Sequence, residues 1–444
     1  MLAQREASGD RVKVGIIGCG KFGAMYLSQA RLTKGIHIVG IADLNVARVG
    51  GTLAHIGWEA ERFATRSFDD AKKHESTFIT DDSASLIRDG NLDVLIEATG
   101  DPAAGIRHCL MAVSHGLHVV MVNVEADVVC GPLLARKAER EGTVYSLAWG
   151  DQPALIAEHV DWARACGFKV VSAGKGTRYL PKFHQSTPDT VWDHFGWDIE
   201  VVKRGRLNPK MFNSFVDGTK SGIEMSAVCN ASGLTPQPDG LAFPPCSRFN
   251  LAEVCKPVEN GGTLTHSGTT EVVSSLSRDG TEIDGHLQYG TYVVIEGETD
   301  YARYCFEEYD MLPDSSFRFA SLYRPTHMIG LELGISVASA ALRGEPTGVP
   351  VAFNSDVVAT AKRDLAAGET LDGEGGFCVW GKQTPARTSL DKGYLPLGLA
   401  QNIKMKRPVG MGERLKWADV EIDESNDAVK ARREMEAMFA GPNG

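Results

Sequence analysis

The first 150 residues alternate between short apolar runs and longer amphipathic segments. The apolar runs are short and rich in β-branched residues, which predicts buried strands. The amphipathic segments between them, such as residues 22–33, have the pattern of helices. Strands that alternate with helices predict a parallel sheet with right-handed crossovers. The predicted strands are residues 12–17, 36–42, 92–98, 118–124 and 143–148.

The pattern changes beyond residue 150, where helical and extended segments are less regular. Helices are expected at 153–167, 221–233 and 326–342, a strand at 168–174 and β-structure at 281–297. Short β runs and Gly-rich turns follow residue 346, and a charged helix ends the chain. We therefore predict an α/β protein with three parts, a Rossmann domain, an α/β substrate domain and a small β-rich domain. Their limits are 1–150 for dinucleotide binding, 151–345 for catalysis and dimerisation, and 346–444 for the β-rich domain with its terminal helix.

A Gly-x-Gly-x-x-Gly motif at residues 18–23 follows the first predicted strand and opens the first helix. In such a loop, the first glycine makes the turn, the second admits a pyrophosphate and the third packs helix against strand. The helix N-terminus adds free N–H groups and a partial positive charge. Asp43 ends the second strand, 20 residues after Gly23. This spacing is typical of the acid that binds the adenosine ribose, so we predict dinucleotide binding.

The residues leave the choice between NAD and NADP open. Asp43 favours NAD, whereas Arg48 is placed to meet a 2′-phosphate or is an exposed helix residue. Polar residues also follow three strands, at 97–100, 123–125 and 150–152, where an open sheet binds its ligand. The predicted cofactor-binding residues are Gly18, Gly20, Lys21, Phe22, Gly23, Asp43, Arg48, Thr99, Gly100 and Asn123.

The charge balance of the chain limits the classes of partner that it is expected to bind. The formal net charge is −11, which argues against nucleic acid or an anionic membrane surface. The nine cysteines include no Cys-x-x-Cys pair, so we expect free thiols in a reducing cytoplasm. No signal peptide and no membrane-spanning segment is expected.

Basic groups near carboxylates mark the predicted substrate domain. Gly-rich loops with lysine, serine and asparagine suit a phosphate group, which an acidic protein must bind in a locally basic pocket. Lys220 and Glu224 lie four residues apart and share a helix face, as a site or as an ordinary ion pair. His184 and His194 show no metal-ligand spacing. The predicted phosphate-binding residues are Lys175, Arg178, Asn213, Ser214 and Lys220.

The segments VGIIGCGKFG, IADLN, EATG and HVVMVNVEA resemble the homoserine dehydrogenase-like oxidoreductases, and the likeness runs through the whole chain. Residues 351–381, with VATAKRDLAAGETLDGEGG, resemble a SAF domain. This combination is similar to the 1-deoxy-D-xylulose 5-phosphate reductoisomerase-like enzymes of some bacteria. The resemblance implies NADPH, a divalent metal (Mg²⁺ or Mn²⁺), a phosphorylated sugar substrate, a homodimer and the first committed step of the methylerythritol phosphate pathway to isoprenoids.

One departure from the homoserine dehydrogenases is informative. They carry Asn-Lys after the fifth strand, and this chain has Asn123-Val124-Glu125, which disfavours homoserine. The ordinary reductoisomerases have Asn-Lys-Glu there, acidic metal ligands after the next strand and a later Asn-Lys-Gly-Leu-Glu run. A loose parallel with them implies metal ligands Asp151 and Glu224 and catalytic groups Glu125 and Lys220. Lys203 is a further candidate for a proton-handling or orienting group.

Three alternatives remain open. The first is a metal-independent dehydrogenase of an amino or hydroxy acid. The second is a non-catalytic dinucleotide sensor, although a sensor does not need the polar strand ends. The third is a sugar-binding or dehydratase function of the SAF type, in which the Rossmann domain is secondary.

Overall fold

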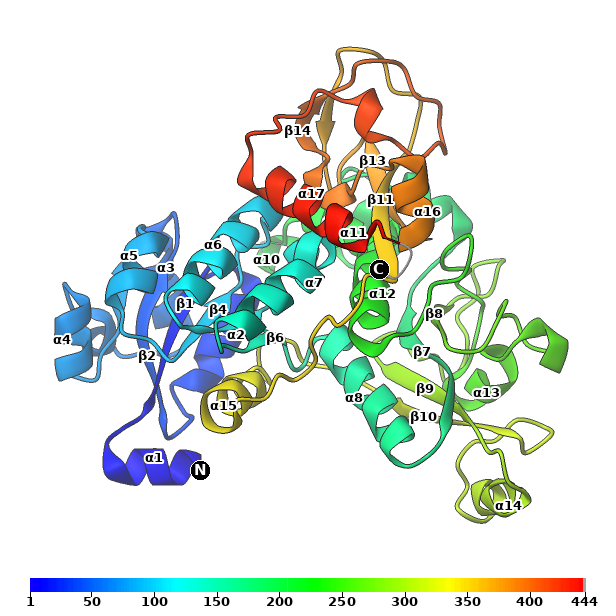
Figure 1. The fold of residues 1–444 in the computed structure, drawn as a ribbon, viewed down its shortest axis with the longest axis horizontal. Coiled ribbons are helices and arrows are strands. Elements are labelled where there is room, and N and C mark those ends of the chain that lie inside the picture. Colours follow the sequence, from blue (N-terminus) through cyan, green and yellow to red (C-terminus); the bar gives the residue numbers. More distant parts are fainter. Residues whose placement is uncertain (206, 442–444) are drawn as a thin grey trace. The chain divides into compact units, whose positions relative to one another are not determined.

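The computed structural model describes residues 1–205 and 207–441, and the chain packs into two compact units (Figure 1). Each unit is assembled from segments that lie far apart in the sequence. The division into two units does not test the three consecutive domains expected above, so their limits at residues 150 and 345 stay a prediction. The first unit comprises Met1–Leu155, Met328–Pro350 and Lys430–Met435, and the second comprises Ile156–His327, Val351–Val429 and Glu436–Gly444.

The first unit is built on a six-stranded parallel sheet with strand order β3-β2-β1-β4-β5-β6. This is the order of a Rossmann fold, as the alternation of strands and helices predicted. β3 has only three residues, which is too short for its apolar pattern to predict a strand from the sequence. The strands are β1 Val12–Ile17, β2 Ile36–Ala42, β3 Phe78–Thr80, β4 Val94–Glu97, β5 His118–Met121 and β6 Tyr145–Leu147.

The strand register brings the ends of neighbouring strands level. Ile17 pairs with Ala42 on one side and with Glu97 on the other. Glu97 in turn pairs with Met121, and Met121 with Leu147. The loops that follow these strands therefore leave the sheet along a single edge, where open α/β sheets bind ligands.

Helices cover both faces of this sheet. The core contains the inward side chains of β1, such as Val14 and Ile16, together with Leu333 and Val337. α7 is kinked at Cys130, because a proline two residues later cannot donate its backbone hydrogen bond. The helices are α1 Leu2–Ser8, α2 Lys21–Ala30, α3 Val46–His55, α4 Phe68–Lys73, α5 Ser83–Asp89, α6 Pro102–Ser114, α7 Val124–Arg140 and α15 Gly334–Arg343, with the 3-10 turn η1 Ala60–Phe63.

The second unit contains a mixed four-stranded sheet with order β10-β9-β7-β8. β7 runs parallel to β8 and antiparallel to β9, and β9 is antiparallel to β10. The strands are β7 Lys169–Thr177, β8 Thr269–Ser274, β9 Thr291–Glu296 and β10 Phe319–Arg324. The helices are α8 Gln152–Ala165, which starts in the first unit, α9 Val191–Phe195, α10 Ile199–Gly205, α11 Pro209–Val216, α12 Thr219–Ser232, α13 Leu251–Val254 and α14 Asp300–Glu308, with 3-10 turns at Pro181–Gln185, Arg248–Asn250 and Val258–Asn260.

The predicted β-rich C-terminal region forms two small antiparallel sheets, β11-β13 and β12-β14. β13 lies close to α12, since Gly381 N–H donates to Thr219 Oγ1 at 2.8 Å. A Cβ atom at Gly222 would lie 3.0 Å from the Gly381 carbonyl oxygen, so this contact favours a small residue. The elements are β11 Ser355–Ala361, β12 Thr370–Asp372, β13 Val379–Pro385, α16 Ala386–Lys392, β14 Gln401–Lys404 and α17 Asp427–Phe439, with 3-10 turns at Leu397–Leu399 and Trp417–Asp419.

Several predicted boundaries were wrong. The strand expected at 118–124 ends at Met121, because the Asn123 side chain accepts a hydrogen bond from Ala126 N–H and caps α7. The helix expected at 326–342 begins at Gly334. Residues 178–218, for which no element is predicted above, contain three short α-helices and a 3-10 turn.

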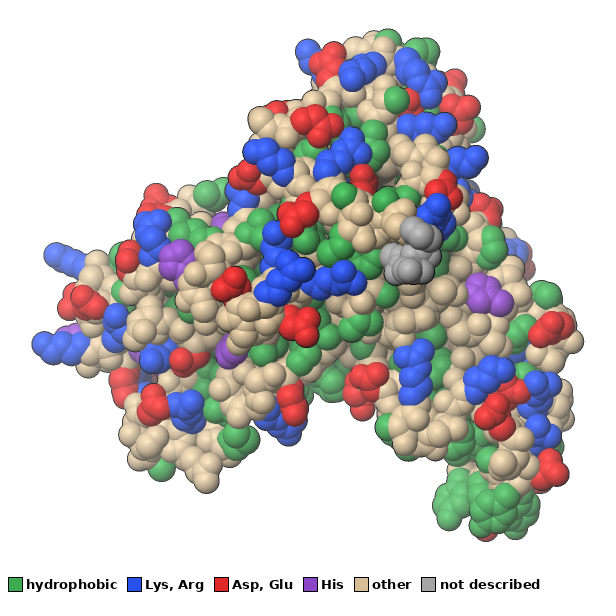
Figure 2. Space-filling model, viewed as in Figure 1, with side chains coloured by type: hydrophobic (Ala, Val, Ile, Leu, Met, Phe, Trp, Pro, Cys, Tyr) green, Lys and Arg blue, Asp and Glu red, His purple; other side chains and the backbone are tan. Residues whose placement is uncertain are grey.

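The surface carries charges of both signs on the face that Figure 2 shows. Apolar and aromatic side chains gather over α14, where Tyr301, Tyr304 and Tyr309 are exposed. Among the described residues, no helix is long and apolar enough to cross a membrane.

Candidate active site

The glycine loop of the first unit connects β1 to α2, and each glycine has a different environment. Gly18 has φ +97°, and a Cβ atom there would lie 2.5 Å from the Ala98 carbonyl oxygen. A Cβ atom at Gly23 would lie 2.3 Å from the Gly18 carbonyl oxygen. The packing of the protein itself thus explains Gly18 and Gly23.

Gly20 differs, because a Cβ atom at this position would meet no heavy atom within 4 Å. Its backbone is extended, with φ −78° and ψ −157°, so the fold does not require a glycine there. No side chain caps α2, whose first turn therefore offers N–H groups to an anion. The residues fit a dinucleotide pyrophosphate, which would pass close to Gly20. Lys21 and Phe22, predicted to bind the cofactor, lie in the first turn of α2.

Asp43 follows β2 and holds the loop in place. Its carboxylate accepts hydrogen bonds from the backbone N–H of Cys19 and Asn45, both at 2.9 Å. The Arg48 guanidinium lies 2.8 and 2.9 Å from the two carboxylate oxygens. The side chain of Asp43 is 7% exposed and that of Arg48 is 55% exposed. Asp43, which favours NAD, and Arg48, which favours NADP, therefore form an ion pair with each other.

The polar residues at the ends of β4 and β5 form one hydrogen-bonded network, and their binding of a ligand stays a prediction. Glu97 is fully buried, and its Oε1 accepts from Thr99 Oγ1 at 2.6 Å. His108 Nδ1 lies 3.2 Å from the same oxygen. The Asn123 amide donates to the Asp101 carbonyl at 2.9 Å. Gly100, in the turn between Thr99 and Asp101, has φ +73°.

His108 was missed by the sequence analysis, because it lies in the middle of α6 and its helix pattern does not distinguish it. Asp127 was missed as well, although it lies on the same helix as Glu125. Burial raises the pKa of Asp127 to about 7, and the Tyr145 hydroxyl donates to it at 2.7 Å. Glu125 is buried in the first turn of α7.

In the second unit, Lys175 and Glu224 form a buried ion pair. Their side chains are 6% and 1% exposed. Lys175 lies on β7 directly opposite Thr291 of β9, and Glu224 lies on α12. Thr291 Oγ1 is 3.1 Å from His159 Nε2, on α8. The predicted phosphate ligand and the predicted metal ligand are thus each other's partner.

The other predicted phosphate ligands have structural contacts. The Asn213 amide donates to the carbonyls of Ser186 and Gly375, at 3.0 and 2.9 Å. Ser214 Oγ donates to the Met211 carbonyl within its own helix. The other predicted site residues of this unit do not share a contact with one another in the described structure. Arg178 donates to the His194 carbonyl, Lys220 is in the first turn of α12, and Lys203 is exposed and pairs with Glu200 at 3.0 Å.

The described residues do not fit a metal centre. Across residues 1–205 and 207–441, no group of three or more His, Cys, Asp or Glu side chains could hold a metal ion. Asp151 belongs to the first unit and Glu224 to the second, where Lys175 already engages the Glu224 carboxylate. We therefore derive no step through a metal.

A family model described as the catalytic domain of oxidoreductase DRL matches residues 150–333, less than half of the chain. No curated protein sequence matches. Together with the glycine loop, the family match supports an oxidoreductase that uses a nicotinamide dinucleotide.

Three solved structures that resemble this chain share 11–15% of its sequence. A probable dehydrogenase from Thermotoga maritima is 11% identical, with a TM-score of 0.38 over 76% of this chain and 90% of that one. A myo-inositol dehydrogenase from Lactobacillus casei in complex with NAD(H) and myo-inositol is 13% identical, with a TM-score of 0.35 over 72% and 75%. A 1-deoxy-D-xylulose 5-phosphate reductoisomerase from Zymomonas mobilis in complex with NADPH is 15% identical, with a TM-score of 0.34 over 49% and 57%.

Proposed function

We propose that this chain is an NADPH-dependent reductoisomerase that converts 1-deoxy-D-xylulose 5-phosphate to 2-C-methyl-D-erythritol 4-phosphate. The observation that carries the dinucleotide part is the open space at Gly20, in a loop whose other two glycines are fixed by packing. The oxidoreductase part is supported by the family match over residues 150–333. The choice of substrate rests on the resemblance of the sequence described above.

The reaction has two parts. The carbon skeleton of the ketose phosphate rearranges to an aldehyde, and the aldehyde carbon then accepts a hydride while its oxygen takes a proton. A bound NADPH would supply the hydride and leave as NADP⁺. The role of the first unit is to bind and orient the cofactor. The first-turn N–H groups of α2 would donate to the pyrophosphate, and Arg48 would pair with the 2′-phosphate.

The ion pair of the second unit is the proposed proton donor. The Lys175 ammonium beside the Glu224 carboxylate can give a proton to the oxygen that becomes negative as hydride adds. Glu224, as its partner in the ion pair, keeps the ammonium in position. Glu125, Lys203 and Lys220 stay predicted catalytic groups, and the exposed pair of Lys203 with Glu200 is the weakest of these predictions.

The decisive experiment is a turnover assay with 1-deoxy-D-xylulose 5-phosphate and NADPH, followed by loss of NADPH absorbance and by identification of the product. It is run with added Mg²⁺, with added Mn²⁺ and with a chelator, because the resemblance implies a divalent metal that the described residues do not hold by themselves. Turnover that survives the chelator would reject the metal dependence.

Two other outcomes would redirect the assignment. Metal-independent oxidation of homoserine, with no consumption of the sugar phosphate, would replace the reductoisomerase by a simple dehydrogenase. NADPH binding without turnover of any tested carbonyl substrate would favour a dinucleotide sensor. Loss of activity in Lys175→Met with unchanged NADPH affinity is expected if the ion pair serves the reaction, and equal activity would remove Lys175 from it.

A further inference from the structure

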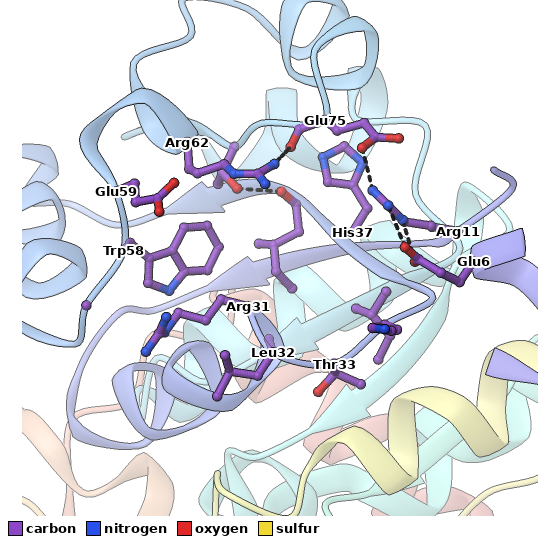
Figure 3. A pocket seen from close by; sticks show the side chains of 16 residues that line it. Glu6, Arg11, Arg31, Leu32, Thr33, His37, Trp58, Glu59, Arg62 and Glu75 are labelled. Atoms are coloured by element: carbon purple, nitrogen blue, oxygen red, sulfur yellow. Dashed lines mark hydrogen bonds and ion pairs between the residues drawn. The ribbon is translucent and has the colours of Figure 1, made fainter. Parts of the chain in front are cut away.

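A cavity lies at the opposite edge of the Rossmann sheet from the glycine loop. It has a volume of about 420 Å³, is open to solvent and is lined by residues at the amino ends of β1 and β2 (Figure 3). β1 has six residues and rises about 3.3 Å per residue, so roughly 20 Å of strand separates the two edges. A ligand in this cavity cannot belong to the cofactor site.

The cavity contains an indole ring in a fixed orientation. Trp58 Nε1 donates to the Leu27 carbonyl at 3.0 Å, which holds the ring in place. Trp58 is half-buried and packs partly against the core of the unit. Among the described residues, no aromatic ring stacks on the indole and no cation lies over it. An aromatic face of this kind is a platform for a planar ring.

Two arginines whose side chains have no carboxylate partner among the described residues lie near the indole. The Arg31 side chain has no hydrogen bond or ion pair within the described part of the chain, and its guanidinium lies beside Gly57, next to Trp58. Arg62 donates only to the backbone carbonyl of Glu75, at 3.3 Å. Lys34 also lines the cavity but lies near the Glu6 carboxylate, at the far end. Unpaired cations in one cavity are unusual in a chain of net charge −11.

The far end of the cavity is different. Arg11 is saturated there, with Glu6 at 2.7 Å and Glu75 at 2.6 Å. Figure 3 shows this cluster at one end and Arg31, Trp58 and Glu59 at the other. Lys34 lies near Glu6, so the far end is close to neutral, and its carboxylates can accept hydrogen bonds from groups such as sugar hydroxyls. The indole end, with Arg31 and Arg62 against Glu59, favours an anion.

We propose that this cavity binds a planar-ring monophosphate of the size of a nucleoside monophosphate. Its ring lies along the Trp58 indole, its phosphate is attracted by the cations that flank the indole, and its hydroxyls face the glutamates of the far end. Because the cavity lies away from the glycine loop, this ligand acts as an effector of the first unit and not as a substrate.

The test is calorimetric titration of the full-length protein with AMP, adenosine and inorganic phosphate. AMP resembles half of a dinucleotide and could bind at the glycine loop. Each titration is therefore made at saturating NADPH, which would occupy the loop. It is repeated on Gly20→Val, in which the loop is blocked even if NADPH does not bind. One AMP per chain is expected under both conditions. AMP should bind more tightly than adenosine or phosphate alone.

Variants separate the cavity from general charge. Arg31→Ala and Arg62→Ala should each weaken AMP about tenfold or more, the loss expected for a hydrogen bond to a charged group. Arg88→Ala, an exposed arginine on α5 outside the cavity, is the matched control and should change the affinity less than about twofold. Trp58→Leu should weaken AMP by about fivefold or more and leave phosphate unchanged.

Absence of AMP binding, or equal affinity in both cavity variants and wild type, overturns the proposal. Phosphate that binds as tightly as AMP overturns the ring part and leaves an anion site. Thermal unfolding of each variant confirms that the fold is intact, which is expected because the two arginines are exposed.

Discussion

Replacement of Gly20 by valine should abolish dinucleotide binding and leave the fold unchanged. An added Cβ meets no heavy atom within 4 Å, and the extended backbone suits a β-branched residue. The free energy of unfolding should therefore change by less than about 0.5 kcal/mol. Valine would occupy the space through which a pyrophosphate reaches the helix N-terminus. Loss of about two hydrogen bonds to charged phosphate oxygens, at about 1.5–3 kcal/mol each, weakens NADPH by at least about 100-fold.

Two matched glycine variants serve as controls for Gly20→Val. Gly18→Ala should lower the melting temperature, because its Cβ would lie 2.5 Å from the Ala98 carbonyl oxygen and φ is +97°. Gly51→Val, at another glycine with open surroundings but on α3, should affect neither property. The assays are fluorescence titration with NADPH and thermal unfolding of the unliganded protein.

The reasoning fails if Gly20→Val binds NADPH as tightly as the wild type, because the open space would then have no connection with a ligand. It fails in another way if Gly20→Val unfolds at a much lower temperature, because the glycine would then be required by the fold.

Three further predictions concern charged groups. Arg48→Ala should weaken NADPH more than NADH, since it removes the only described cation that pairs with the acid after β2; equal losses in titrations with both cofactors would make Arg48 a surface residue. Burial raises the pKa of Asp127 to about 7, so the folded state binds its proton more strongly than the unfolded chain, and stability should fall as pH rises from about 4 to 7, by up to about 1.4 kcal/mol per pH unit. Asp127→Asn should flatten this slope in denaturant unfolding at several pH values, and an identical slope in both proteins would contradict the buried charge. Lys175→Met leaves the Glu224 carboxylate buried without its partner and should cost about 3–5 kcal/mol in chemical denaturation, while the double variant with Glu224→Gln should recover most of the loss; additive losses would show that the pair is not coupled.

The cofactor side of the fold was predictable because its signals are local. Gly18, Gly20 and Gly23 lie within six residues, and strand and helix patterns flank them on both sides. The position of Asp43 followed from the length of one helix and one strand. The contact of Arg48 with Asp43 was not predictable, because two side chains five residues apart in a loop and a helix start have many possible arrangements.

The substrate side was harder to predict because its contacts are long-range. Lys175 and Glu224 were both named as site residues, but only the packing of α12 on the mixed sheet makes them partners. Asn213 looked like a phosphate ligand because asparagine is frequent in such loops, yet its amide is consumed by two backbone carbonyls that are distant in sequence. Asp127 lies within an apolar helical pattern, and its hydrogen-bond partner Tyr145 belongs to β6, 18 residues further along the chain.

The packing of α15 against β1 has a consequence for the order in which the protein is made. Val12 and Val337 share one hydrophobic core, although 325 positions separate them along the chain. At about 5–20 residues per second, the ribosome needs roughly 15–65 s to add the segment between them. During that interval, one face of the nascent sheet lacks its covering helix and exposes apolar side chains. A truncated protein that ends before Gly334 should therefore aggregate during synthesis, whereas co-expression of the missing segment offers it the surface that it lacks.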